Sequence, residues 1–388
     1  MKLARNNNTA IMWLSLAHLA NDTYTGFLNP LMPFIAEKLG FTLGLATILL
    51  GITQICSNLF QPIFGYFADN MIKRFFIFWG LIFTSIFIPL APSAQNVFIL
   101  TLFMVLGSLG SSFFHPQATG FINFFSSSDC SKNMGIFVGF GSMGFALGPL
   151  LAAYITQDFG LDNILYTSIL GLILASTMFL LVPKLSIIYK KPEKKEFTKT
   201  FKTIFSNLQI KYLMLISMMK SLVTSSSCIL LPFLWKSLGH GAFYIGFALF
   251  LFVFAGAIGS LTSPYIEKKW GSRFIIYLSM WITFPLMVCF ALTYKTMPFF
   301  SLILFSLIGF CTMLAQPVTL IWAQKTLPQY KSIIAGLING FCWGIIALCL
   351  SFLGIIAQKY GIISILVILT FLPIPASYIV SKLQKYKN

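Results

Sequence analysis

Residues 11–36 read IMWLSLAHLANDTYTGFLNPLMPFIA, and this stretch decides how the rest of the chain is interpreted. It is mostly apolar and long enough for a tilted helix to cross a bilayer. Asp22 lies near its middle, with Asn21 beside it and His18 one helical turn earlier, on the same face. A charged side chain at bilayer depth costs about 2.5–3.5 kcal/mol and normally faces a partner or a cavity. We therefore expect a functional reason for Asp22.

The composition indicates a membrane protein. Of the 388 residues, 57% are hydrophobic and only 9% are charged, and the mean hydropathy is +0.87. A soluble domain carries about 25% charged residues. The net charge of +17 would also suit a nucleic-acid-binding protein, so the distribution of the charges has to separate the two classes.

Twelve apolar runs follow one another along the chain, separated by short polar connections. They cover about 10–36, 43–68, 75–93, 97–125, 133–157, 163–183, 209–236, 242–264, 273–292, 297–324, 331–357 and 361–381. Placing both termini and every second connection on one side collects 21 of the 26 lysine and arginine residues there. This asymmetry follows the positive-inside rule, so we expect cytoplasmic termini and exclude nucleic acid as a partner.

A repeat divides the chain into two halves. Residue pairs recur at an offset of 199 early in the halves and of 201 later; they include Pro33 and Pro232, Arg74 and Arg273, His115 and Gln316, and Gly135 and Gly336. The expected fold is an all-α membrane protein with twelve transmembrane helices in two pseudo-symmetric six-helix bundles. The predicted domains are a bundle at 1–183, a basic cytoplasmic linker at 184–208 that faces anionic lipid, and a bundle at 209–388.

The connection after the second run resembles a cytoplasmic signature of the major facilitator family, GxxxD(R/K)xG(R/K)(R/K). Gly65, Asp69, Lys73 and Arg74 match it, whereas Asn70 and Ile72 depart from it. The resemblance implies a latch that holds one conformation of a transporter. The alternative is a loop with ordinary positive-inside charges.

The fifth run contains Gly135, Gly144, Gly148 and Pro149 at a spacing that resembles the antiporter signature of the same family. Small residues at this spacing form a groove that admits another helix, and Pro149 can bend the helix. Ala152 stands where that signature continues with glycine. A closely packed helix without an antiport role is the alternative.

The fourth run contains His115 followed by Pro116, where we expect a kink with a titratable ring. Together with AHLAND at 17–22 and SNLFQPIFGYFAD at 57–69, this run resembles the fosmidomycin-resistance branch of the major facilitators. That branch comprises proton-coupled drug exporters. The resemblance implies that Asp22, His18 and His115 belong to a central cavity and couple transport to protons. A histidine satisfied by packing is the alternative for His115.

Further polar residues in the runs are candidates for substrate binding. They are Asn21, Lys220, Gln54, Gln117 and Gln316. Lys220 aligns with Asn21 at the offset of 199, so we expect it to approach Asp22 directly or through an anionic substrate. The alternatives are a lysine that snorkels to the cytoplasmic interface and amides that join helices.

The favoured hypothesis is a monomeric exporter of a small organic compound, driven by protons, in the inner membrane of a bacterium. A metabolite importer of the same fold is the second hypothesis, because direction cannot be inferred from residues. The sequence contains no nucleophile elbow, phosphate loop or HExxH motif, so we expect no enzyme and no cofactor. The seven cysteines lack CxxC spacing, so we expect no metal; a non-transporting receptor is the remote alternative.

The charge distribution predicts the topology. Green fluorescent protein fused after residue 195 should fluoresce in the cytoplasm of a bacterial host, because the basic linker is expected there. Alkaline phosphatase fused after residue 295 should be active, because that connection is expected in the periplasm. Activity of alkaline phosphatase at residue 195 would contradict the topology.

Overall fold

The computed structural model describes residues 2–61, 63–64, 75–126, 130–182 and 197–383, and all secondary structure in these ranges is helical. The chain forms two compact units. One is built from the described parts of 1–42, 49–190 and 235–250, and the other from those of 43–48, 191–234 and 251–388.

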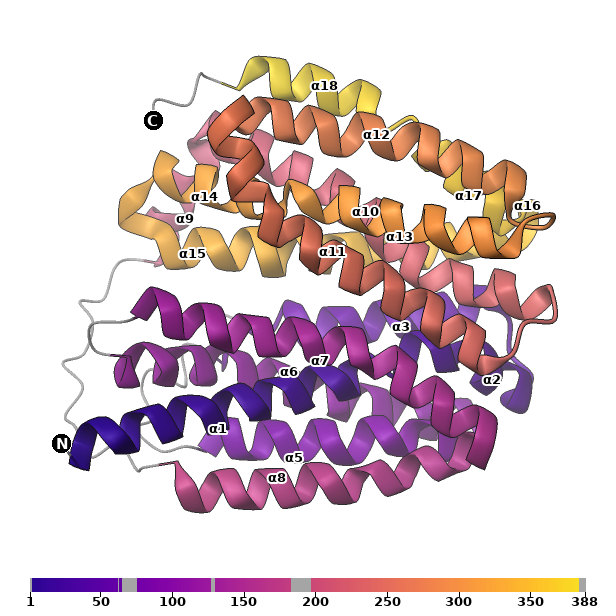
Figure 1. Ribbon diagram of the computed structural model, residues 1–388, viewed down its shortest axis with the longest axis horizontal. Helices are drawn as coiled ribbons and strands as arrows, with labels where there is room; N and C mark the ends of the chain where they lie inside the picture. Colours follow the sequence, from indigo (N-terminus) through magenta and orange to yellow (C-terminus); the bar gives the residue numbers. More distant parts are fainter. Residues whose placement is uncertain (1, 62, 65–74, 127–129, 183–196, 384–388) are drawn as a thin grey trace. The chain divides into compact units, whose positions relative to one another are not determined.

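The first unit consists of long helices and short connections. Its elements are α1 (Lys2–Thr25), α2 (Leu28–Leu39), most of α3 (Leu43–Asn58), α5 (Phe75–Leu90), η1 (Ala91–Ser93), α6 (Val97–Phe125), α7 (Cys130–Phe159), η2 (Leu161–Thr167) and α8 (Ser168–Leu181). Figure 1 shows α1, α5, α6, α7 and α8 running alongside one another. Apolar side chains such as Leu14, Leu81, Phe114 and Met178 form the core between them.

The second unit repeats this plan with more interruptions. Its elements are α9 (Phe197–Ser206), most of α10 (Leu208–Ser237) and of α11 (Ala242–Trp270), α12 (Ser272–Thr293), α13 (Pro298–Leu314), α14 (Gln316–Thr326), η3 (Pro328–Tyr330), α15 (Lys331–Gly336), the π-helix η4 (Leu337–Phe341), α16 (Cys342–Tyr360), α17 (Ile362–Leu369) and α18 (Pro373–Lys382). The helix α9 lies in the stretch predicted as the linker, and Ile204 on it is fully buried.

Ten helical segments in the described ranges are long and apolar enough to span a membrane, and they coincide with the third to twelfth apolar runs. The first run instead divides into α1 and α2 at Gly26 and Phe27. Pro30 explains the break, because it has no N–H to donate to the carbonyl of Gly26 one turn earlier. Asp22 therefore lies in the last turn of α1, where the Gly26 N–H donates to its backbone carbonyl.

The predicted groove on the fifth run receives α1. A Cβ added at Gly144 would lie 2.1 Å from the carbonyl oxygen of Leu19, and one at Gly148 would lie 2.3 Å from that of Thr23. Only glycine permits this approach of two backbones. A Cβ at Gly135 would meet nothing within 4 Å, so this glycine is not part of the close contact. Both α7 and α6 remain single helices, through Pro149 and Pro116 respectively.

Gln117, a predicted substrate-binding residue, makes a hydrogen bond that supports the fold. Its side chain is 3% exposed, and its Oε1 accepts a hydrogen bond of 2.9 Å from the backbone N–H of Ile77. Ile77 lies in the first turn of α5, where helical N–H groups have no partner in their own helix. The amide thus joins the start of α5 to α6. The predicted latch residues Gly65, Asp69, Lys73 and Arg74 lie outside the described residues.

Replacing Gln117 should test this support. Gln117→Leu leaves the Ile77 N–H buried without its acceptor, which costs about 1–3 kcal/mol, so we expect the melting temperature of the purified protein to fall by several degrees. Gln61→Leu is the control, because among the described residues the Gln61 amide donates to the Ser57 carbonyl of its own helix, one turn away. Equal melting temperatures for the two variants would contradict the role assigned to Gln117.

Candidate functional site

The structure brings the three predicted coupling residues together in the first unit. His18 Nε2 lies 3.2 Å from Asp22 Oδ2, and His115 Nε2 lies 3.4 Å from Asp22 Oδ1. The first pair spans one turn of α1, whereas His115 reaches the carboxylate from α6. The side chains are 9%, 17% and 24% exposed for His18, Asp22 and His115, so the cluster is largely removed from solvent.

The helix α7 determines the orientation of the His18 ring. His18 Nδ1 lies 2.8 Å from the carbonyl oxygen of Phe137. The His18 ring also stacks on the Phe137 ring, with centroids 4.1 Å apart and planes at 28°. Because a carbonyl only accepts, His18 Nδ1 must carry a proton and donate it.

This hydrogen bond restricts what can lie between His18 and Asp22. With Nδ1 protonated, a neutral His18 would direct the lone pair of Nε2 at the carboxylate. Two acceptors do not approach to 3.2 Å without a hydrogen between them. A hydrogen bond across this distance would need one further proton, on Nε2 or on Oδ2, beyond those of neutral histidine and ionised aspartate.

Gly141 provides the space for this ring. A Cβ added at Gly141 would lie 2.3–2.7 Å from three atoms of the His18 ring. A side chain there would push the ring away from Asp22 or separate α1 from α7. Gly139, two residues earlier on α7, would accept a Cβ with no atom within 4 Å.

Asn21 holds the other side of the carboxylate. Its Nδ2 donates to Asp22 Oδ1 at 2.9 Å and to Ser111 Oγ on α6 at 3.2 Å. Asn21 is fully buried, and its Oδ1 has no hydrogen-bond partner among the described residues. The carboxylate thus receives contacts from three side chains on two helices.

Two imidazoles and a carboxylate are also a possible ligand set for a divalent metal ion. His18, Asp22 and His115 are the described residues whose ligand atoms gather closely enough, all within 4.8 Å of one another. Both imidazoles already lie at hydrogen-bond distance from the carboxylate, and Asn21 donates to Oδ1 as well. This arrangement fits a site that holds a proton better than an open metal site.

Lys220 and Gln316 meet in the second unit. Lys220, on α10, is 4% exposed, and its Nζ donates to Gln316 Oε1 at 3.3 Å. Burial of the ammonium argues against a lysine that snorkels to the interface. Its predicted approach to Asp22 joins the two units and stays a prediction. Gln54, on α3, has a buried Oε1 without a partner in the described chain, and its role in substrate binding also stays a prediction.

Sequence comparison identifies the family. The profile of the Major Facilitator Superfamily matches residues 14–351. The chain belongs to the Major Facilitator Superfamily. It is therefore a multi-pass membrane transporter of small molecules and not an enzyme.

Individual relatives support the same assignment. The chain is 27% identical to the fosmidomycin resistance protein of Escherichia coli K12 over 377 residues, covering 93% of this chain and 89% of the relative. The expected similarity to the fosmidomycin-resistance branch of the major facilitators is thus confirmed. The chain also resembles the nucleoside transporter NupG, with a TM-score of 0.71 at 15% identity over 97% and 100% of the two chains. A bacterial homolog of the human lysosomal transporter Spinster gives 0.73 at 13% identity over 97% and 96%. At such identities the two structures support the fold alone.

Two positioning residues of this major facilitator were not inferred from the sequence. Phe137 contacts His18 through its backbone carbonyl. Every residue has such a carbonyl, so the identity of the side chain could not indicate this contact. Gly141 belongs to the glycine-rich part of the fifth run, and its spacing from Gly144 and Gly148 could have marked it. Its particular contact with a histidine depends on how α1 lies in the groove.

Gly141→Ala should break the hydrogen bond of His18. The chain has three histidines, so a ¹⁵N spectrum of histidine-labelled protein can follow each ring. We expect the signal of the protonated, hydrogen-bonded Nδ1 of His18 in the unmodified protein and in Gly139→Ala, and its loss in Gly141→Ala. Persistence of that signal in Gly141→Ala would contradict the assigned contact.

Proposed function

We propose that the protein is a proton-coupled exporter of a small organic compound, working by alternating access in the inner membrane of a bacterium. The observation that carries this proposal is the approach of His18 Nε2 to Asp22 Oδ2 at 3.2 Å, while His18 Nδ1 faces the Phe137 carbonyl oxygen. A carboxylate in an apolar helix is unfavourable when charged and unpaired. When the cluster holds the proton, the charge of Asp22 is neutralised. When the proton leaves, the carboxylate needs another partner, so binding and release of the proton can each favour a different conformation of the transporter.

The assignment of roles follows from the contacts. Asp22 binds the transported proton, because both imidazoles and Asn21 converge on its carboxylate. His18 is held in one tautomer by Phe137 and shares that proton. His115, with no hydrogen bond of its ring to a backbone carbonyl among the described contacts, is the group that can turn and pass the proton on.

Export is favoured by two observations. The glycine positions of α7 resemble the antiporter signature, and two of them contact the backbone of α1 directly. The relative from Escherichia coli is named for resistance to fosmidomycin, and removal of a toxic compound from the cell is one route to resistance. We therefore propose antiport of a drug-like compound against protons. Proton-coupled import of a metabolite is the alternative, and accumulation in inverted against right-side-out vesicles distinguishes the two.

The cargo can be sought by growth. A bacterial strain lacking its own fosmidomycin resistance protein should tolerate at least severalfold more fosmidomycin, or another toxic compound of a panel, when it expresses this chain. The compound with the largest effect then serves as the substrate in vesicles. Uniform sensitivity across the panel would argue against export of a toxic compound.

Asp22→Asn should abolish proton-driven transport in proteoliposomes. Asparagine keeps the size of the side chain and one acceptor oxygen but binds no proton, so flux driven by an imposed pH gradient should fall at least tenfold. Substrate exchange without a gradient should persist, because the binding site remains. Asp158→Asn is the matched control, since Asp158 is exposed at the end of α7. Unchanged gradient-driven flux in Asp22→Asn would disprove the coupling role.

A further inference from the structure

The second unit contains a buried lysine amine for which the described residues of that unit provide no carboxylate partner. Lys220 is 4% exposed, and its printed hydrogen bond runs to the neutral Gln316. None of the ion pairs in the described residues includes it. An ammonium ion buried beside a single neutral acceptor is unfavourable, unless a ligand supplies the negative charge.

The amides beside Lys220 are oriented as hydrogen-bond donors toward a ligand. Lys220 can only donate, so Gln316 must turn its Oε1 toward it, and Gln316 Nε2 donates to Asn339 Oδ1 at 3.1 Å. This leaves the Nδ2 of Asn339 and two N–H groups of Lys220 as further donors. Asn339 is exposed, Gln316 half-buried and Lys220 buried, so the cluster is open at the asparagine end.

The backbone at Asn339 is specialised. Asn339 lies in the middle of η4, a π-helical turn inserted between α15 and α16. Such turns are rare and concentrate at functional sites, because the extra residue shifts the side chains that follow relative to a regular helix. The irregular backbone and the buried charge are independent observations at one cluster.

The helix α10 adds buried hydroxyl groups on the face of Lys220. Thr224 and Ser227 follow Lys220 by four and seven residues, so the three share one face. Both hydroxyls are buried and have no hydrogen-bond partner among the described residues. Other buried hydroxyls in this unit, such as those of Thr283 and Thr312, donate to carbonyls of their own helices. On α10 itself, Ser221, Ser225 and Ser226 are also buried without a partner among the described residues, so unpaired hydroxyls surround this part of the helix.

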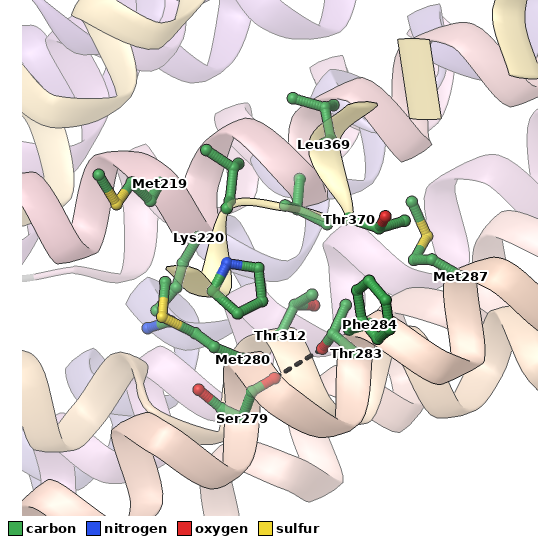
Figure 2. A pocket seen from close by; sticks show the side chains of 13 residues that line it. Met219, Lys220, Ser279, Met280, Thr283, Phe284, Met287, Thr312, Leu369 and Thr370 are labelled. Carbon is green, nitrogen blue, oxygen red and sulfur yellow. Dashed lines mark hydrogen bonds between the residues drawn. The ribbon is translucent and has the colours of Figure 1, made fainter. Parts of the chain in front are cut away.

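A small cavity lies beside the same lysine (Figure 2). Its lining includes Lys220, the hydroxyl-bearing Thr283 and Thr370, and the apolar side chains of Met280 and Met287. Lys220 thus forms part of the wall of a mainly apolar cavity, and its Nζ donates to Gln316, which does not line that cavity. No carboxylate contributes to this lining.

The repeat relates this cluster to the one around Asp22. His18 and Ser217 correspond at the offset of 199, and Phe137 and Ile338 correspond at 201. His18 Nδ1 lies 2.8 Å from the Phe137 carbonyl oxygen, and Ser217 Oγ lies 3.5 Å from that of Ile338. The same backbone contact thus occurs in both units. The first copy surrounds a carboxylate, and the second surrounds an ammonium.

We propose that Lys220, Gln316 and Asn339 bind an oxyanion group. This inference rests on the proposed function, and it specifies the cargo as a small organic acid that carries a carboxylate or phosphonate. Such a group accepts several hydrogen bonds at once, which matches the free donors of the cluster. An anionic lipid headgroup has the same chemistry and is the competing source of the anion.

Binding can be measured without transport. The probes are methylphosphonate and acetate, with the uncharged dimethyl methylphosphonate and acetamide as controls, added to the full chain in phosphatidylcholine nanodiscs. We expect both acids, and neither control, to raise the melting temperature in a saturable manner. Lys220→Gln should weaken binding of the acids roughly 10- to 100-fold, because a charge-assisted hydrogen bond is lost.

Two variants guard against misfolding. Lys236→Gln changes another lysine of α10, which pairs with Glu37, and should leave acid binding unchanged. Lys220→Arg keeps the charge and should bind the acids within a fewfold of the unmodified protein. Equal stabilisation by the uncharged probes, or unchanged acid binding in Lys220→Gln, would overturn the proposal.

The source of the anion and the proposed function are tested separately. Stabilisation by phosphatidylglycerol nanodiscs with no effect of the soluble acids would overturn the assignment of the site to cargo. Gradient-driven flux that persists in Asp22→Asn would disprove proton coupling at Asp22 and leave the oxyanion site untouched. Acid binding that is unaltered in Lys220→Gln would disprove the oxyanion site and leave proton coupling untouched.

Discussion

The structure of the first unit depends on one constraint: a carboxylate placed in an apolar helix must be paired. Asp22 meets this requirement with two imidazoles and an amide, at distances of 3.2, 3.4 and 2.9 Å. The pairing needs α1 and α7 in backbone contact, because the Phe137 carbonyl orients the His18 ring. Glycines 141, 144 and 148 make that contact possible by presenting no side chain. The same contact between α1 and α7 therefore packs the unit and positions the candidate coupling residues.

The two units show how a repeat can keep geometry while its chemistry diverges. A side chain of the first helix of each half reaches the carbonyl of a corresponding residue, Phe137 or Ile338. Around this shared contact, His115 of one half corresponds to Gln316 of the other. A duplicated scaffold thus offers two equivalent positions at which different side chains can be placed.

Irregular backbone marks the second unit more than the first. The helix α6 continues through Pro116, whereas its counterpart is divided at Ala315 into α13 and α14, directly before Gln316. The π-turn η4 brings Asn339 to the same amide. Both interruptions lie beside the amide pair of Gln316 and Asn339.

The sequence by itself determined the helical membrane fold, the repeat and the pairing of His18 with Asp22, because hydropathy, offset and helical spacing are local properties of a chain. It also indicated the groove on the fifth run. The tertiary structure alone decided that α1 fills this groove, that Phe137 and Gly141 position His18, and that Gln117 supports α5 at Ile77. These contacts join residues 40 or more positions apart, and packing between helices selects them, because many partners are equally compatible with the pattern of each helix alone.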